Sequence, residues 1–138
     1  MSKKIEIILV TPNVTNHDKY KFYGHGDMVV MRCITGDIGI LPGRVACSAI
    51  LSDGVLRIMD GDEKLKIAIM GGVFQFKNDV LTIVTKNALL PGEIDISATK
   101  IQISEYENRL IHENNVTEKD KIRKILRRQK VLLDVATA

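Results

Sequence analysis

The sequence predicts a mainly β protein in which an N-terminal β-sandwich is followed by a C-terminal antiparallel hairpin of two helices. Up to about residue 88, short runs of alternating apolar residues recur at roughly ten-residue spacing with turn formers between them, which is typical of an all-β sandwich or barrel. After residue 92, glycine and proline are absent and the apolar spacing becomes helical. We therefore expect a sandwich domain over residues 1–90 and a helical hairpin over residues 91–138.

Six apolar runs mark strands in the first domain. They are Ile5 to Leu9, Met28 to Val30, Leu56 to Ile58, Leu65 to Ile69, Val73 to Phe76, and Leu81 to Ile83. Asp60-Gly61-Asp62 and Asn78-Asp79 have the composition of hairpin turns, so each is expected to join the strands on either side of it. The pair Gly71-Gly72 ends the strand before it.

The second domain has two apolar stripes separated by the polar segment 114–117. The stripes consist of Thr99, Ile103, Tyr106 and Leu110, and of Ile122, Ile125, Leu126, Leu132 and Leu133. They predict helices over about residues 97–112 and 118–135, with Ser97 and Thr117 as N-terminal caps. Two such helices bury little surface by themselves, so the hairpin either packs on the sandwich permanently, inserts into a partner, or switches between the two.

The composition is that of an ordinary globular chain, with 45% hydrophobic residues. No apolar run approaches the roughly 20 residues needed to span a bilayer, and the first residues lack the features of a signal peptide. We therefore expect a cytoplasmic protein without direct membrane insertion. The net charge of +3 lies entirely in residues 96–138, which carry 9 basic and 6 acidic residues. Partner contacts by charge are expected there.

Residues for catalysis or metal binding do not form a recognisable pattern. His17, His25 and His112 are widely scattered, and Cys33 and Cys47 have neither zinc-site nor disulfide-framework spacing. The glycine-rich stretches lack the Lys-Ser/Thr ending of a phosphate-binding loop and the dinucleotide fingerprint. We expect free thiols, no metal and no enzymatic activity in this chain.

A basic cluster occupies the second predicted helix. It consists of Lys119, Lys121, Arg123, Lys124, Arg127, Arg128 and Lys130. Arg123 and Arg127 are four residues apart, as are Lys124 and Arg128, so their side chains share one side of the helix. Such a face suits an acidic protein or phosphates, although it can also be simply solvated. The neutral sandwich half and the absence of tryptophan argue against nucleic acid as the partner.

Three segments together resemble the epsilon subunit of F-type ATP synthases. They are Gly36-Asp37-Ile38-Gly39-Ile40-Leu41-Pro42-Gly43, the strand ending in Gly71-Gly72, and Glu93-Ile94-Asp95 before the helices. The resemblance extends from about Ile5 to about Leu133. It implies a ten-stranded sandwich and a non-catalytic central-stalk subunit, peripheral to the cytoplasmic face of the membrane. The implied partners are the gamma subunit, the c-ring, and the catalytic beta and alpha subunits.

The resemblance also implies candidate site residues. Those for the contact with the c-ring and gamma are Gly36, Asp37, Gly39, Leu41, Pro42, Gly43 and Arg44. Those for an inhibitory contact, made when the hairpin extends into the catalytic head and restrains ATP hydrolysis, are Arg123, Lys124, Arg127 and Arg128. Arg44 stands where the family usually has histidine.

Some relatives also bind ATP, which would place a weak site at Asp95, Arg123 and Arg127. In this chain Ala98 replaces the arginine of the family's ATP motif. We therefore expect weak nucleotide binding or none, and no cofactor. The alternative to the whole assignment is a free-standing β-sandwich module whose basic helix docks on an acidic protein or on RNA.

Overall fold

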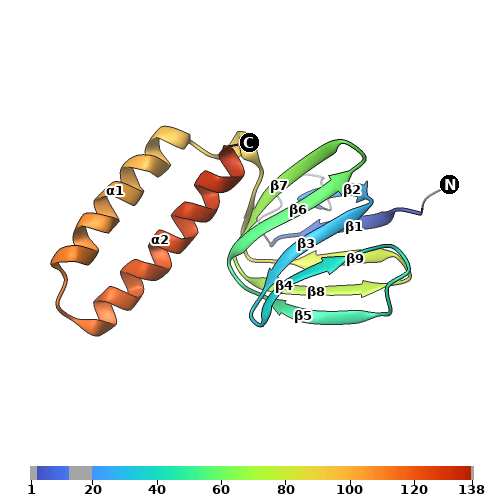
Figure 1. The fold of residues 1–138 in the computed structure, drawn as a ribbon, viewed down its shortest axis with the longest axis horizontal. Helices are drawn as coiled ribbons and strands as arrows, with labels where there is room; N and C mark the ends of the chain where they lie inside the picture. The colour runs from blue at the N-terminus through green and yellow to red at the C-terminus, as the bar shows by residue number, and fades with distance from the viewer. Residues whose placement is uncertain (1–2, 13–19, 138) are drawn as a thin grey trace.

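The computed structural model describes residues 3–12 and 20–137, and within them ten strands precede two helices (Figure 1). The strands are β1 (Ile5–Val10), β2 (Phe22–Gly26), β3 (Met28–Cys33), β4 (Gly36–Ile40), β5 (Cys47–Leu51), β6 (Gly54–Asp60), β7 (Glu63–Ile69), β8 (Gly72–Lys77), β9 (Val80–Val84) and β10 (Ala88–Leu89). A short 3₁₀ turn, η1 (Pro91–Glu93), leads into α1 (Ile96–His112) and α2 (Val116–Ala136). The predicted fold class, a β-sandwich followed by a helical hairpin, is confirmed.

The ten strands form one curled sheet that folds over into two layers. One layer has the order β10-β7-β6-β3, with β4 on the other side of β3, and the second has the order β5-β8-β9-β1-β2. The layers are joined where Cys33 of β3 pairs with Leu51 of β5. β1 and β9 pair in parallel, whereas the other described pairings are antiparallel.

Turn chemistry fixes the two predicted hairpins. Asn78 and Asp79, between β8 and β9, have φ values of 52° and 61°, the left-handed pair that a two-residue hairpin turn requires. Gly61 has φ 60° between β6 and β7. Gly72 cannot be replaced easily, because its φ is 120° and a Cβ there would lie 2.2 Å from the Val84 carbonyl oxygen.

The core lies between the two layers and follows the predicted alternation. In β1, Ile5, Ile7 and Leu9 are fully buried, while the residues between them face outward. Phe74 and Phe76 of β8 are the largest of the fully buried side chains. One face of β1 and one face of β8 are thus apolar, because each covers the opposite layer.

Both helices begin earlier than the sequence predicts. Asp95 rather than Ser97 caps α1, its carboxylate accepting a hydrogen bond from the Ala98 amide at 3.0 Å. Asn115 rather than Thr117 caps α2, its side-chain oxygen accepting from the amides of Thr117 and Glu118. The prediction of both caps is wrong, because an Asp or Asn two residues upstream already meets the free amides of the first turn.

Of the two helices, α2 makes the main contact of the hairpin with the sandwich. α2 lies between α1 and the sheet, and it contacts β6 and β7 (Figure 1). Val135 of α2 is buried against Val55 and Ala68 of those strands, with five partly buried apolar residues around them. Of the helices in the described residues, none is long and apolar enough to cross a membrane.

Candidate functional site

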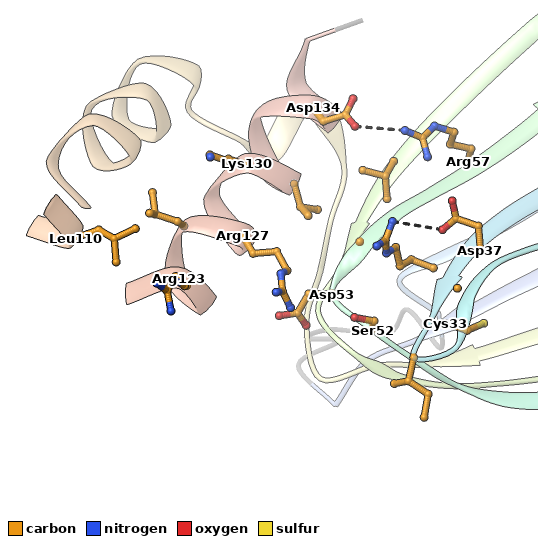
Figure 2. A pocket seen from close by; sticks show the side chains of 17 residues that line it. Cys33, Asp37, Ser52, Asp53, Arg57, Leu110, Arg123, Arg127, Lys130 and Asp134 are labelled. Atoms are coloured by element: carbon orange, nitrogen blue, oxygen red, sulfur yellow. Dashed lines mark hydrogen bonds and ion pairs between the residues drawn. The ribbon is translucent and has the colours of Figure 1, made fainter. Parts of the chain in front are cut away.

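A charged cleft of about 860 Å³ lies between α2 and one end of the sandwich (Figure 2). The sandwich wall is formed by the turn between β3 and β4, the turn between β5 and β6, and Arg57 of β6. On the helical side the cleft is lined by Arg123, Arg127 and Lys130, with Asp134 at the base of the hairpin. The cleft therefore brings basic side chains of the hairpin opposite acidic and basic side chains of the sandwich.

The structure brings the four predicted inhibitory residues together on α2. Arg123 pairs within the helix with Asp120 at 3.1 Å, while Lys124 and Arg127 form no ion pair within the described part of the chain. Arg128 reaches the sandwich, where its Nε lies 2.8 Å from the Asp53 carboxylate. The basic face thus stays accessible in part, and one of its members, Arg128, is held by a contact with the sandwich.

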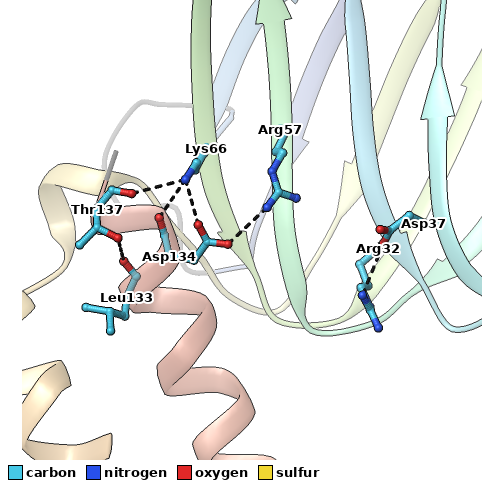
Figure 3. A network of polar contacts seen from close by, with 7 residues as sticks. All are labelled: Arg32, Asp37, Arg57, Lys66, Leu133, Asp134 and Thr137. Atoms are coloured by element: carbon cyan, nitrogen blue, oxygen red, sulfur yellow. Dashed lines mark hydrogen bonds and ion pairs between the residues drawn. The ribbon is translucent and has the colours of Figure 1, made fainter.

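A second acidic residue, Asp134, ties the other end of α2 to the sandwich (Figure 3). Its carboxylate accepts from Arg57 at 3.3 Å and from Lys66 at 2.9 Å. Lys66 also reaches the backbone carbonyls of Asp134 and Thr137. Lys66 therefore donates hydrogen bonds both to the Asp134 carboxylate and to backbone carbonyls that have no partner within the helix at its C-terminal end.

The sequence alone does not identify Asp53 or Asp134 as site residues. Of the two, only Asp134 has a sequence feature that indicates a partner. Asp134 lies in the last turn of a basic helix, where a carboxylate is repelled by the negative end of the helix dipole. An acidic residue in that place, among apolar neighbours, indicates a cationic partner from elsewhere in the chain. Asp53 lies in a Ser-Asp-Gly turn, where aspartate is a common turn residue, so its presence does not indicate a partner.

The predicted c-ring and gamma residues extend along β4 from one end to the other. Asp37, near the start of the strand, lies 3.7 Å from Arg32 and lines the cleft beside the hairpin. Beyond the far end, the Gly43 amide donates to the Asp79 carboxylate at 2.7 Å, and Arg44 donates to the Gly39 carbonyl. A five-residue strand spans roughly 16 Å, so these residues form two patches at opposite ends of one edge strand.

The three residues of the expected weak ATP site do not meet in this conformation. Arg123 and Arg127 line the cleft, whereas Asp95 caps the start of α1, which lies beside the end of α2 and outside that lining (Figure 1). Ala98 uses its amide to complete the cap, and its side chain is exposed.

The cysteines and histidines have the following places in the structure. Cys33 is buried, Cys47 is half-buried and both are free thiols. Burial raises the pKa of the Cys33 thiol. The structure describes His25 and His112, and His17 lies outside the described residues. Across the described ranges, no group of histidine, cysteine and acidic residues is arranged to hold a metal ion.

The outer face of the second layer carries an apolar row that the sequence analysis did not single out. Ile50, Val73 and Val84 are direct cross-strand neighbours on β5, β8 and β9, and each is about half exposed. Val10 of β1 continues the row beside Val84. We call these four residues the apolar row. The helices do not cover it, since α2 packs on the other layer.

Comparison with known proteins places this architecture in one class. Residues 6–91 match the family model described as ATP synthase, Delta/Epsilon chain, beta-sandwich domain. The chain is 33% identical over 110 residues to the ATP synthase epsilon chain of Alkalihalophilus pseudofirmus, with 80% of each chain covered. It is 32% identical over 108 residues to that of Brevibacillus brevis, with 78% of each covered. The chain belongs to the epsilon-subunit family of F-type ATP synthases.

Solved structures share the fold over nearly the whole chain. A chain of the Euglena gracilis mitochondrial ATP synthase, in a structure of OSCP, F1 and the c-ring, superposes with a TM-score of 0.77 at 19% identity. The match covers 98% of this chain and 82% of that one. A chain of the Tetrahymena thermophila mitochondrial ATP synthase central stalk and c-ring gives a TM-score of 0.61 at 13% identity, with coverage of 99% and 98%.

Proposed function

We propose that this chain is a non-catalytic rotor subunit of the central stalk, at the cytoplasmic face of the membrane. It couples ion-driven rotation of the c-ring to ATP synthesis in the catalytic head. The observation that carries this proposal is the uncovered apolar row on the sandwich of a chain that belongs to this family. A contiguous exposed apolar face on a small domain marks a surface that a partner covers.

The apolar row is the surface that we assign to the gamma subunit. Its flanks are polar, because Ser48, Gln75 and Thr82 form the next cross-strand row on β5, β8 and β9. An apolar centre with a polar margin is the usual anatomy of a protein interface. The helical hairpin lies against the opposite layer, so gamma can bind this face whether the hairpin is docked or extended.

The edge strand β4 and the segment after it are the surface that we assign to the c-ring. The outer edge of β4 pairs with no other strand among the described residues. Leu41 is 54% exposed just beyond the strand, between the acidic Asp37 and the basic Arg44. Charges of opposite sign around an exposed apolar residue suit the polar loops of the c-ring. Such charges determine the orientation in which two proteins bind more than the affinity between them.

The basic face of α2 is the surface that we assign to the catalytic beta and alpha subunits. Arg123, Lys124 and Arg127 are exposed in the docked hairpin, whereas Arg128 is paired with the sandwich. A docked hairpin therefore presents an incomplete face, and restraint of ATP hydrolysis requires the hairpin to leave the sandwich.

Binding to the isolated gamma subunit tests the proposal. Val73→Asp places a charge at the centre of the apolar row without touching the core. We expect low-micromolar or tighter binding by the parent chain and a loss of at least about tenfold with Val73→Asp, since burying an unpaired carboxylate is costly. Ile101→Asp is the control, because Ile101 is 66% exposed on α1 and distant from the row.

The alternative function is a free-standing module whose basic helix docks on an acidic protein or on RNA. It predicts no affinity for gamma together with binding of RNA that weakens steeply as salt is raised. Equal gamma binding by the parent and Val73→Asp chains would leave the assembly role standing but would overturn the assignment of this face.

A further inference from the structure

We infer that Asp134 is a latch residue that holds the hairpin down on the sandwich. Residue 134 lies in the last turns of α2, and both of its cationic partners come from the sandwich strands β6 and β7. The inference deepens the proposed function, on which it rests for its consequence in the assembled enzyme, because it names the residue that controls release of the basic face.

The latch is a compact network with one carboxylate at its centre (Figure 3). The Asp134 carboxylate accepts from Arg57 on one oxygen and from Lys66 on the other. Lys66 completes the network by donating to the carbonyls of Asp134 and Thr137, 3.2 and 3.4 Å away. A cation at the end of a helix is favoured by the helix dipole as well as by the carboxylate, so Lys66 gains from both.

The rest of the docking interface is small, so the ionic network of Asp134 makes a large part of the free energy of docking. Among the described residues, the apolar cluster at this interface has three buried members, namely Val55, Ala68 and Val135. The Arg128–Asp53 pair is the second ionic contact from α2 to the sandwich. With so small an apolar contact, an ionic network is a substantial part of what favours the docked state, so removing it shifts the balance toward the undocked state.

The start of the hairpin is fastened independently of the latch. The Glu93 carboxylate accepts from Lys21 at 2.7 Å and from the Leu90 amide at 3.0 Å. These bonds hold η1 on the sandwich and leave Ile94 and Asp95 as the connection to α1. When the latch opens, the hairpin therefore pivots about these two residues rather than detaching with η1.

Ionic strength is expected to open the latch. The three side chains of the network are 29% to 43% exposed, so dissolved ions reach them and weaken their attraction. The buried apolar contacts of the interface are not weakened in this way. The hairpin should therefore undock over a range of NaCl concentrations in which the sandwich stays folded.

A single tryptophan introduced at the interface reports docking directly. The chain has no tryptophan, and Leu132 packs partly buried at the docking patch. Leu132→Trp is introduced into the full-length chain, and the emission maximum is followed from 20 mM to 1 M NaCl. The same measurement is made after adding Asp134→Asn. The control is Glu107→Gln, which removes an equal charge from a pair within the hairpin, Lys130–Glu107.

Three results decide the inference. We expect the Leu132→Trp chain and its Glu107→Gln control to shift from buried to solvated emission as salt rises. We expect the emission of Asp134→Asn to lie closer to the solvated value than that of the parent already at low salt, with the open-to-docked ratio raised roughly fivefold, as for an ionic network of about 1 kcal/mol. Emission of Asp134→Asn that matches that of the Leu132→Trp parent at every salt concentration, with the sandwich shown to be folded by circular dichroism, overturns the latch.

ATP hydrolysis by the reconstituted synthase separates the latch from the proposed function. If Asp134→Asn opens the hairpin and also lowers the rate of ATP hydrolysis, the latch and the inhibitory role of the hairpin are both supported. Opening with an unchanged hydrolysis rate supports the latch and removes the inhibitory role of the hairpin.

Discussion

Arg128 of α2 donates to the carboxylate of Asp53 across 2.8 Å, joining residues that lie 75 positions apart in the chain. Asp53 is well shielded, with 13% of its side chain exposed, whereas Arg128 is 45% exposed. The sandwich thus holds one of the basic residues that we assign to the catalytic subunits. If the basic face restrains hydrolysis as we propose, docking and inhibition compete for the Arg128 guanidinium group, and this competition can be tested by substitutions in the sandwich.

Asp53→Asn should increase inhibition of ATP hydrolysis by the reconstituted synthase. The substitution removes the charge that retains Arg128 but keeps a side chain of the same size in the turn. We expect a fall in hydrolysis rate of about threefold to fivefold, in keeping with a partly exposed ion pair. Asp62→Asn, in the exposed turn between β6 and β7, is the control and should not change the rate. A rate unaffected by Asp53→Asn would show that this pair does not limit release of the hairpin.

Replacing Arg123, Lys124, Arg127 and Arg128 together by alanine should release ATP hydrolysis. Truncation after Asp95 should have the same effect, because it removes both helices. The sandwich has its own core, so assembly with gamma is expected to persist in both variants. The measurement is the hydrolysis rate of reconstituted enzyme with each chain, and equal rates for all three chains would contradict an inhibitory hairpin.

Gly72→Ala should destabilise the sandwich by about 2 kcal/mol or more. A Cβ at this position would collide with the Val84 carbonyl oxygen, and the φ of 120° is unfavourable for alanine. Gly92→Ala is the matched control, because nothing lies within 4 Å of a Cβ there. Urea unfolding should show a lower midpoint for Gly72→Ala alone. Equal midpoints would mean that β8 and β9 move apart without cost.

The stabilising effect of Glu93 should depend on pH. The hydrogen bond from Lys21, with a second from the Leu90 amide, lowers the pKa of Glu93 below its ordinary value of 4.5. A carboxyl group with a lowered pKa in the folded state stabilises the protein fully above pH 4.5 and loses this effect as pH falls through the folded pKa.

The difference in unfolding free energy between the parent and Glu93→Gln should therefore be largest at neutral pH and shrink below pH 4.5. Urea unfolding at several pH values measures this difference. Glu105→Gln, an exposed change on α1, gives the control. A difference that stays constant from pH 7 to pH 3 would show that Glu93 acts without its charge.

Ala98→Arg should strengthen ATP binding only through a rearrangement of the hairpin, because Asp95 lies apart from Arg123 and Arg127 in the docked conformation. In the parent we expect weak binding or none, because the residue that supplies the positive charge in the ATP motif of relatives is absent. Position 98 has an exposed side chain, and only its backbone amide serves the helix cap, so arginine fits there without displacing a contact. Calorimetric titration of ATP into both chains measures the change. Equal, undetectable binding would show that Asp95, Arg123 and Arg127 do not form a site even when the motif is restored.

The features predicted from the sequence are those set by local patterns. The alternation around Ile7 and Leu81 reveals strands because each covers a core on one face only. The turn at Asn78 and Asp79 is recognisable because few residues tolerate its backbone. By contrast, the sequence does not predict β2, which reads Phe-Tyr-Gly-His-Gly, because its two glycines are typical of a turn. This segment is a strand because its backbone pairs with β1.

In the candidate site, too, the features set by local spacing are predictable from the sequence and those set by tertiary contacts are not. The basic face was predictable because Arg123 and Arg127 lie one helical turn apart. The contact of Asp134 with Lys66 joins residues 68 positions apart, and no spacing along the chain reveals it. The separation of Asp37 from Arg44 also depends on structure, because the segment between them is an extended strand rather than a loop.

The parallel pairing of β1 with β9 has a consequence for the order in which this chain folds as it is synthesised. β1 is made first, and the nearby β2 can pair with one of its edges soon afterwards. Its other edge stays unpaired until residues 80–84 have been made. During that time Ile5, Ile7 and Leu9 have no completed core to enter. The beginning of the chain therefore depends on the last long strand of the sandwich, and an arrest of synthesis before that strand leaves an apolar edge open to aggregation.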